Sequence, residues 1–273
     1  MTLKLVIMSD LHLVPEGEVS NTLDTAARLR DAVDSVNTRH ADADMVILAG
    51  DLADLGEADA YARLPGLIAP LPMETHLMLG NHDDRPTFLE VFGDSYADEN
   101  GFVQKVIDIK GHRVILLDST EPGLVAGRIC DTRLAWLQAR LDEARDMPVI
   151  VVLHHHAAKL SMPVDRIRLE EPEKLLAVLK THPDIRHVIS GHVHITTTAV
   201  WQGIPFTTIA GGHYSAKLHL ESAAGLVKLV DGPGQYGVVL AEADNCIVHF
   251  ENFIDAHYEI ARENFGRLRA ERR

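Results

Sequence analysis

The fold of this chain is decided by one stretch, Val46-Ile47-Leu48-Ala49-Gly50-Asp51. Four apolar residues lead into a glycine and a carboxylate, a pattern that predicts a buried strand followed by a tight turn. Asp51 then lies at the carboxyl end of the strand, where it can ionise and share its two oxygens between two cations.

Four other stretches have the same form, an apolar run that ends in Asp, Asn or His. Their residue ranges are 5–12, 75–83, 149–155 and 188–194, and their ligand-type residues are Asp10, His12, Asn81, His154, His192 and His194. In the first stretch, residues i and i+2 of an extended backbone point the same way, so both side chains can reach one ion. One such strand end means little, but five are hard to explain by packing alone.

The length and charge of the chain restrict its function. A length of 273 residues allows one large α/β domain, alone or with a smaller appendage. Lys and Arg number 26 against 40 Asp and Glu, for a net charge of −14, which argues against a nucleic-acid groove. A small anionic substrate at a metal centre stays compatible with this charge, because the cations supply the attraction.

The sequence offers no sign of export or of a membrane segment. Cys130 and Cys246 have neither zinc-site nor redox spacing, as expected for reduced thiols. Residues 1–8 run directly into the first strand without a signal pattern, and no apolar run approaches the ~20 residues of a membrane span. We therefore expect a cytoplasmic protein that has no membrane partner.

The order of the predicted elements indicates a mixed sheet and two parts of unequal size. Strands alternate with helical patterns early, starting with a helix capped at Ser20-Asn21, and pair as hairpins later. From residue 217 no strand ends in a ligand-type residue, although apolar strands recur and a helix is predicted at 258–273. We therefore expect a catalytic domain at 1–216. Residues 217–273 are expected to form a cap or oligomerisation segment outside the catalytic layers, since three short strands are marginal alone.

The collected strand-end residues point to metal chemistry. Two carboxylates, one amide oxygen and four imidazoles suit a pair of divalent ions such as Mn, Fe, Co or Zn, and the absence of Cys argues against a structural zinc site. The positive charge of two divalent ions exceeds the negative charge of two aspartates. The surplus positive charge can ionise a bound water and still attract an anion. Two metals ~3.5–4 Å apart can hold the attacking and leaving oxygens of an in-line displacement at phosphorus. Asp51 is the expected bridge between the two metals.

A departing oxygen also needs a group that stabilises or protonates it. His82 directly follows Asn81 and is the natural catalytic candidate, with Asp83 or Asp84 as the group that orients it. Asn81 and His82 are accordingly expected to contact the substrate.

Five motifs of the chain resemble those of calcineurin-like metallophosphoesterases, in order and in spacing, over residues 10–194. They are Asp10-x-His12, Gly50-Asp51, Gly80-Asn81-His82-Asp83, His154-His155 and Gly191-His192-Val193-His194. The third and fifth motifs look most like those of class III cyclic-nucleotide and glycerophosphodiester phosphodiesterases. The resemblance implies an αββα sandwich, two mixed sheets flanked by helices, with a dimetal site at one edge.

The resemblance also implies a division of the ligands between the two ions. One ion takes Asp10, His12, Asp51 and His194, and the other takes Asp51, Asn81, His154 and His192.

Two departures from the family pattern leave residue roles open. His156 and Ala157 stand where relatives often have Pro-Pro, so His156 either lines the pocket or fills the turn. His213 falls where the resemblance places a substrate-facing loop, and the preceding Gly-Gly permits close backbone approach. His213 is therefore either a substrate contact or part of a structural loop.

The leading hypothesis is metal-dependent hydrolysis of small phosphodiesters, such as cyclic nucleotides or glycerophosphodiesters. We also expect the protein to form a homo-oligomer. The alternatives are a phosphomonoesterase or nuclease of the same superfamily, or a metal-dependent scaffold without turnover. The negative charge disfavours the nuclease, and His82 beside a full ligand set disfavours the scaffold. No Arg stands within the five motifs to hold a monoester dianion, and Arg85 is the one nearby candidate for that role.

Overall fold

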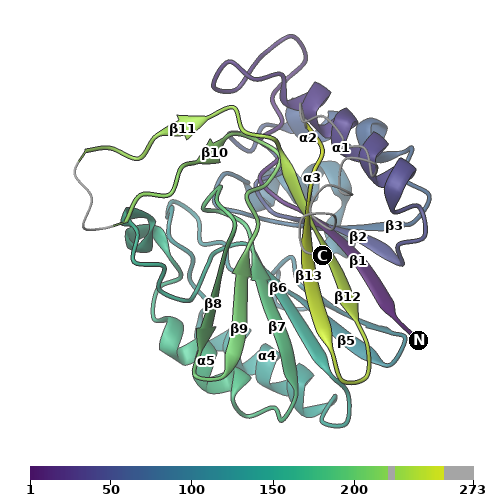
Figure 1. Ribbon diagram of the computed structural model, residues 1–273, viewed down its shortest axis with the longest axis vertical. Helices are drawn as coiled ribbons and strands as arrows, with labels where there is room; N and C mark the ends of the chain where they lie inside the picture. Colours follow the sequence, from purple (N-terminus) through teal and green to yellow (C-terminus); the bar gives the residue numbers. More distant parts are fainter. Residues whose placement is uncertain (221–224, 255–273) are drawn as a thin grey trace, which may run out of the picture.

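Two mixed β-sheets pack face to face in a computed structural model that describes residues 1–220 and 225–254 (Figure 1). The first sheet contains, in spatial order, β13 (Cys246–Asn252), β12 (Gln235–Ala241), β1 (Leu3–Met8), β2 (Met45–Ala49) and β3 (Glu74–Met78). The second contains β4 (Lys105–Ile109), β5 (His112–Leu117), β6 (Val149–Leu153), β7 (Ile185–Ser190), β9 (Ile204–Thr208) and β8 (Thr197–Trp201).

Helices cover the outer face of each sheet, which completes four layers. The first sheet packs on α1 (Thr25–Arg39), α2 (Ala58–Ile68) and α3 (Arg85–Phe92), and the second packs on α4 (Asp131–Asp142) and α5 (Pro172–Leu179). Two short 3-10 helices, η1 (Asp94–Tyr96) and η2 (Pro163–Ile167), lie in the connections. The αββα sandwich expected from the sequence is confirmed.

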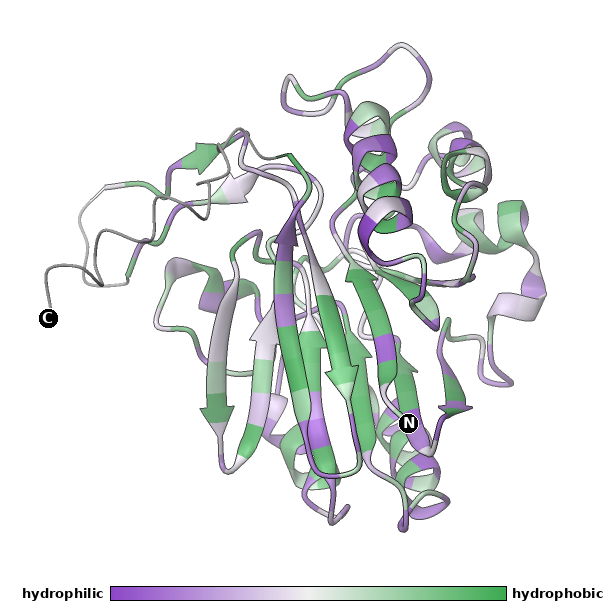
Figure 2. Cartoon of the chain, turned by 45° about the vertical axis from the view of Figure 1, so that its right-hand side comes forward, coloured by the Kyte–Doolittle hydropathy of each residue, from purple (hydrophilic) through white to green (hydrophobic). Residues whose placement is uncertain are grey.

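The central strands are apolar on both faces because each face meets another layer. In β1, Leu5 and Ile7 point between the sheets, whereas Val6 and Met8 point towards the helices. Figure 2 shows this arrangement as apolar strands inside and helices with mixed polarity outside. Burial on both faces explains why these strands read as continuous apolar runs instead of alternating patterns.

The parallel strands determine where the functional residues meet. β1, β2 and β3 are parallel to one another, as are β5, β6, β7 and β9. The carboxyl ends of parallel neighbours lie at the same edge of a sheet, so the turns after β1, β2, β3, β6 and β7 are brought together.

The expectation that everything after residue 216 lies outside the catalytic layers is wrong for two strands. β12 pairs antiparallel with β1, and β13 pairs with β12, so both extend the first sheet. Val239 and Ala241 of β12 are buried between the two sheets, and this burial holds the strand there. The short pair β10 (Ser215–Ala216) and β11 (Leu229–Val230) instead projects from the body (Figure 1).

Two of the expected helices differ from the prediction or lie outside the described residues. α1 starts later than predicted, because Asp24 and not Ser20-Asn21 is its N-cap, with the Asp24 side chain accepting from the backbone N of Ala27 at 2.9 Å. The helix predicted at 258–273 lies outside the described residues. Within them, no helix is long and apolar enough to cross a membrane.

Candidate metal centre

The turns that follow the parallel strands are tied to one another by backbone hydrogen bonds. The N–H of Asp10 donates to Gly50 O at 3.0 Å, and the N–H of His12 donates to Asp51 O at 2.9 Å. Across the two sheets, the N–H of His192 donates to the Asp10 carboxylate at 3.0 Å. These bonds place residues that are far apart in the sequence around one small volume.

Several of the ligand-type residues have left-handed backbone conformations. The residues and φ angles are Asp10 at 55°, His12 at 46°, Asp51 at 52°, His192 at 73° and His194 at 51°. Such a conformation costs a non-glycine residue of order ~1–3 kcal/mol and persists where the surroundings enforce it, often at functional sites. In these strained backbone conformations the side chains are directed inward and are buried.

Two glycines allow the turns to approach closely. A Cβ on Gly80 would lie 2.2 Å from Oδ1 of Asp51, and a Cβ on Gly191 would lie 1.8 Å from Oγ of Ser9. Only glycine fits either position, since both distances are far below van der Waals contact.

Asp51 lies at the centre of the assembled side chains. Its Oδ2 is 3.2 Å from Nε2 of His154 and 3.6 Å from Nε2 of His12. On the neighbouring side, Nε2 of His194 is 3.5 Å from Oδ1 of Asp10. Asp51 belongs to two groups whose ligand atoms lie within 4.8 Å of one another, one with Asp10 and His154 and one with His12 and His82. A bridging position for Asp51 agrees with this geometry.

Each of the four ligand-type histidines has one ring nitrogen engaged by a fixed acceptor. The pairs are His12 Nδ1 with Asp54 Oδ1 at 2.8 Å, His154 Nδ1 with Ala49 O, His192 Nε2 with Ile167 O and His194 Nδ1 with Tyr214 O, the last three each at 2.9 Å. A carbonyl or carboxylate can only accept, so the engaged nitrogen carries a proton, and in the neutral ring the other nitrogen presents a lone pair. Metal-binding histidines have this arrangement.

Two candidate ligand atoms, His12 Nε2 and Asn81 Oδ1, are buried and have no hydrogen-bond partner among the described residues, and the buried His154 Nε2 has the Asp51 carboxylate at 3.2 Å as an ion-pair partner. An unpartnered buried polar atom is costly and requires an explanation. Imidazole, amide and carboxylate donors suit borderline divalent ions. The residues present therefore fit metal ions.

The charges at the centre are coupled. Burial alone would lower the pKa of His154, but the adjacent Asp51 carboxylate outweighs burial and raises this pKa to about 9. Burial would raise the pKa of Asp51, yet His154 and His12 hold it well below its usual range. A cation bound here competes with the proton on His154, so proton release and metal binding are linked.

His82 lies beside this centre, and its orientation corrects one expectation. Its Nδ1 donates to Asp54 O at 2.6 Å, and its backbone N donates to Asp51 Oδ1 at 2.9 Å. Neither Asp83 nor Asp84 orients the ring, because Asp84 caps α3 through the backbone N of Thr87. Asp54 was not predicted from the sequence, where its only signal is its position three residues after Asp51.

Asp83 instead stabilises the turn that carries Asp51. Its carboxylate accepts from the backbone N of Leu52, Ala53 and Gly80, and from the hydroxyl of Tyr61 at 3.0 Å. Burial and the nearby charge of Asp51 raise the pKa of Asp83 to about 6, although these hydrogen bonds oppose the rise.

Three further histidines surround the ligand set and are buried. His213 has an exposed fraction of 0%, stacks on His12 with ring centroids 4.5 Å apart, and bonds Ser20 O through Nε2 at 3.3 Å. His156 stacks on His192 at 5.8 Å, and His155 Nδ1 bonds Ser119 Oγ at 2.8 Å. Their contacts are thus with histidines of the centre and with Ser20 and Ser119, and substrate contact by His213 stays a prediction.

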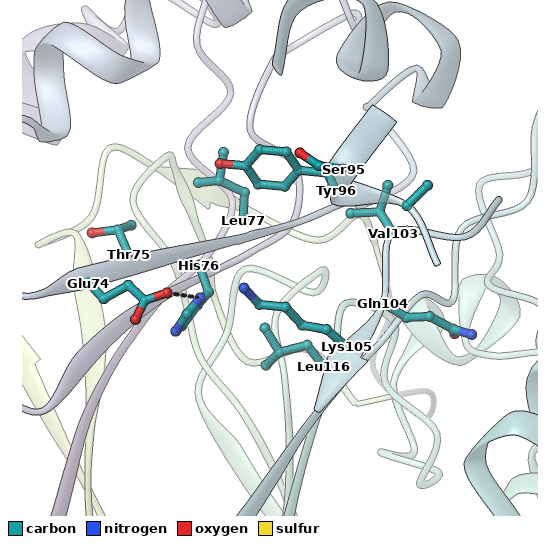
Figure 3. Close-up of a pocket in the computed structure, with 11 residues that line it drawn as sticks. Glu74, Thr75, His76, Leu77, Ser95, Tyr96, Val103, Gln104, Lys105 and Leu116 are labelled. Carbon is teal, nitrogen blue, oxygen red and sulfur yellow. Dashed lines mark ion pairs between the residues drawn. The ribbon is translucent and has the colours of Figure 1, made fainter. Parts of the chain in front are cut away.

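A cavity of about 350 Å³ lies away from this centre, between the edge strands β3 and β4 (Figure 3). Glu74, His76 and Lys105 line it, with the Glu74 carboxylate 3.5 Å from Nδ1 of His76. None of the seven ligand-type residues lines it, so its volume does not make it the reaction site.

Comparison with known proteins agrees with this centre. The family model described as calcineurin-like phosphoesterase matches residues 3–196. A probable cyclic nucleotide phosphodiesterase of Rhodopseudomonas palustris is 34% identical over 92% of this chain and 93% of its own length. The 3′,5′-cyclic adenosine monophosphate phosphodiesterase CpdA of Pseudomonas aeruginosa is 32% identical over 70% of this chain and 69% of its own. The glycerophosphodiester phosphodiesterase GpdQ of Enterobacter lignolyticus is 27% identical over 74% of both chains.

Solved structures show the same fold at low sequence identity. A dimetal phosphatase from Danio rerio has a TM-score of 0.70 and 17% identity, covering 93% of this chain and 97% of its own. The five motifs that resembled one family in the sequence therefore lie on that family's fold, and the family model covers them all. This chain belongs to the calcineurin-like phosphoesterase family.

Proposed function

We propose that this protein hydrolyses small phosphodiesters with two divalent metal ions, Mn, Fe, Co or Zn, held by seven residues. The proposed ligands are Asp10, His12, Asp51, Asn81, His154, His192 and His194. The observation that carries the proposal is the set of buried donor atoms around Asp51: His12 Nε2 and Asn81 Oδ1, which have no hydrogen-bond partner among the described residues, and His154 Nε2, which faces the Asp51 carboxylate at 3.2 Å. The phosphodiesterase names of the relatives support the same reaction.

When bound, the ions supply Lewis acidity and a nucleophile at neutral pH. The protein's own contribution is to hold the donors in place. The fixed acceptors of the four histidines keep their free nitrogens directed inward. Asn81 adds an oxygen donor without adding negative charge, so the site stays attractive to an anionic substrate.

His82 is the proposed proton donor to the leaving oxygen. Its Nδ1 is engaged by the carbonyl of Asp54, so Nε2 is the nitrogen that can exchange a proton with a substrate. The half-buried ring lies at the metal centre, with its centroid 4.5 Å from that of His12. A single positioned acid or base typically contributes about 10²–10⁴ to the rate.

The position of Arg85 supports diesters over monoesters. Its Nε and Nη2 both donate to Asp118 Oδ2, at 3.0 and 2.8 Å, and Nη2 also donates to Thr120 O. Nε and Nη2 of this guanidinium are thus engaged within the protein, which disfavours a bidentate contact with the second charge of a monoester. Asp10 and Asp51 would offset part of the charge of two divalent ions, so the centre would keep a small positive surplus that suits the single negative charge of a diester.

The test is metal-reconstituted enzyme assayed side by side on an aryl monoester, the matching acyclic diester and a 3′,5′-cyclic nucleotide. We expect kcat/KM to be higher on the diesters, and Asp51→Ala to lose metal together with activity. A higher kcat/KM on the monoester would reject the diester assignment. Full metal content and near-normal turnover in Asp51→Ala would reject its bridging role. A cytoplasmic location and a homo-oligomer are parts of the proposal that need separate measurements.

A further inference from the structure

The acceptor behind His192 lies in a connection and not in a strand. Ile167 O, which is 2.9 Å from His192 Nε2, belongs to the short 3-10 helix η2 between β6 and α5. The acceptor behind His154 is instead the carbonyl of Ala49, at the buried end of β2. The sheet fixes a strand carbonyl, whereas a carbonyl in a connection needs other contacts to hold it in place.

Asp165 closes the turn that leads into η2. Its Oδ1 accepts from the backbone N of Leu160 at 2.8 Å, and its Oδ2 accepts from the backbone N of Met162 at 3.3 Å. Ser161, between these two residues, has a φ angle of 57°, a left-handed conformation that persists only where the surroundings enforce it. One carboxylate thus holds the backbone on both sides of the strained residue, and it does so two positions before Ile167.

The same carboxylate lies close to the ring of His192. Its Oδ1 is 3.6 Å from Nε2 of His156, and the Asp165 side chain is only 10% exposed. The His156 ring in turn stacks on the His192 ring, with centroids 5.8 Å apart and an interplanar angle of 28°. A single buried ring therefore separates Asp165 from a proposed metal ligand.

Backbone hydrogen bonds hold the chain on the other side of Ile167. The N–H of Leu169 donates to His156 O at 2.9 Å, and the N–H of Glu170 donates to Gly127 O at 2.7 Å. Leu169 is also buried in the core under the second sheet. Both bonds come after Ile167 in the sequence, and the corresponding fastening before it is the Asp165 carboxylate.

We propose that Asp165 is a positioning residue for the metal centre. By holding the turn before η2, it keeps Ile167 O against His192 Nε2 and leaves Nδ1 of His192 as the nitrogen for an ion. The inference rests on the proposed function. It makes Asp165 responsible for the affinity of one of the two ions, the one that His192 would bind together with Asn81 and His154.

The first test is a Co²⁺ titration of the metal-free protein, followed by the absorption of the bound ion. Asp165→Ala should weaken one of the two binding steps by about 10- to 100-fold, the usual loss behind a metal-binding histidine, and change the other step less than about threefold. Asp165→Asn keeps one oxygen acceptor and should lie between Asp165→Ala and the wild type. Arg166→Ala, at an exposed position of η2, is the matched control and should bind both ions like the wild type.

Two results of this titration would overturn the inference. Unchanged affinities in Asp165→Ala would show that His192 needs no support from this turn. Equal losses at both steps, with a lower melting temperature of the metal-free protein, would show that Asp165 serves the fold in general. Should Asp165→Ala not fold, Asp165→Asn decides by the same two results.

A second measurement needs no metal and separates the inference from the proposed function. The Nε2 proton of His192 gives an NMR signal in the metal-free protein while its bond to Ile167 O protects it from exchange with water, and His192→Gln identifies the signal. We expect this signal in the wild type and in Arg166→Ala, and its loss in Asp165→Ala. That loss supports the positioning role even if the protein binds no metal and the proposed function fails. A signal that persists in Asp165→Ala rejects the role of Asp165 alone.

Discussion

The side chain of Asp54 forms a hydrogen bond with His12, with Nδ1 of His12 lying 2.8 Å from Oδ1 of Asp54. The carbonyl of the same aspartate lies 2.6 Å from Nδ1 of His82. One residue thus positions a proposed metal ligand through its side chain and the proposed proton donor through its backbone. These two functions can be separated, because a side-chain substitution removes only the first.

Asp54→Ala should therefore weaken metal binding more than it weakens the chemical step. Loss of a partner behind a metal-binding histidine typically costs about 10- to 100-fold in metal affinity or activity. The measurement is a metal titration, followed by kcat at saturating metal. Asp42→Ala is the control, since Asp42 is a surface carboxylate with a side-chain exposure of 76%. Unchanged metal affinity in Asp54→Ala would show that His12 needs no support.

His82→Ala should keep its metal and lose rate. The ring donates to a carbonyl and is not needed to complete the ligand set, so kcat should fall by about 10²–10⁴. His249→Ala, at an exposed position of β13, is the matched control and should behave like the wild type. If metal content falls in step with rate, His82 is a ligand and its assigned role is wrong.

Gly80→Ala should disrupt the centre without touching a ligand side chain. The added Cβ would lie 2.2 Å from Oδ1 and 2.5 Å from N of Asp51, so the Asp51 turn must move. We expect loss of metal binding and a lower melting temperature. Gly66→Ala in α2 is the control: no atom lies within 4 Å of its added Cβ, and helix propensity predicts about 0.5–1 kcal/mol of stabilisation. Normal metal content in Gly80→Ala would mean that the turn can relax.

The strand ends that carry the ligand-type residues could be predicted from the sequence because the signal is local. In each stretch a buried strand gives an apolar run, and the following turn carries a side chain of a metal-binding type. The parallel order of β1, β2 and β3 then brings their ends together. Strand order alone therefore places Asp10, Asp51 and Asn81 at one edge.

Contacts between distant segments could not be predicted from the sequence. β12 pairs with β1 although Val238 and Val6, which face each other, are separated by most of the chain. An apolar strand looks the same whether it lies in a cap or in the main sheet, so residues 235–252 were misplaced. The ion pair of Arg85 with Asp118 and the support of His12 by Asp54 are likewise tertiary contacts without a motif of their own.

His187 should make the protein less stable in acid. It is buried in β7, where its Nε2 bonds Thr207 Oγ1 at 2.7 Å, and burial lowers its pKa to about 4. Between the unfolded pKa of about 6.5 and the folded value, only the unfolded chain binds this proton, so stability is lost as pH falls through that window. At pH 5 this linkage amounts to about 2 kcal/mol.

The measurement is denaturant unfolding of wild type and His187→Gln at pH 7 and at pH 5. Gln keeps a hydrogen-bonding group and removes the titration, so the wild type should lose about 2 kcal/mol more than the variant between the two pH values. Equal losses in both proteins would show that His187 is not the group that titrates.

Arg85→Gln tests whether this guanidinium serves the fold or the substrate. Asp118 is fully buried and also accepts from the backbone N of Val103 and Thr120, so loss of its main cation should destabilise the protein. Removing one partner of a buried pair typically costs about 3–5 kcal/mol, and the loss here should be smaller than that because Nη1 of Arg133 stays 3.7 Å from Asp118 Oδ1. We expect a lower free energy of unfolding, while the ratio of kcat/KM on diester and monoester stays within about threefold of the wild type. Because the guanidinium faces Asp118, neither substrate should depend on it. A selective loss of monoester hydrolysis in a stably folded Arg85→Gln protein would place Arg85 at the substrate and weaken the argument for a diesterase.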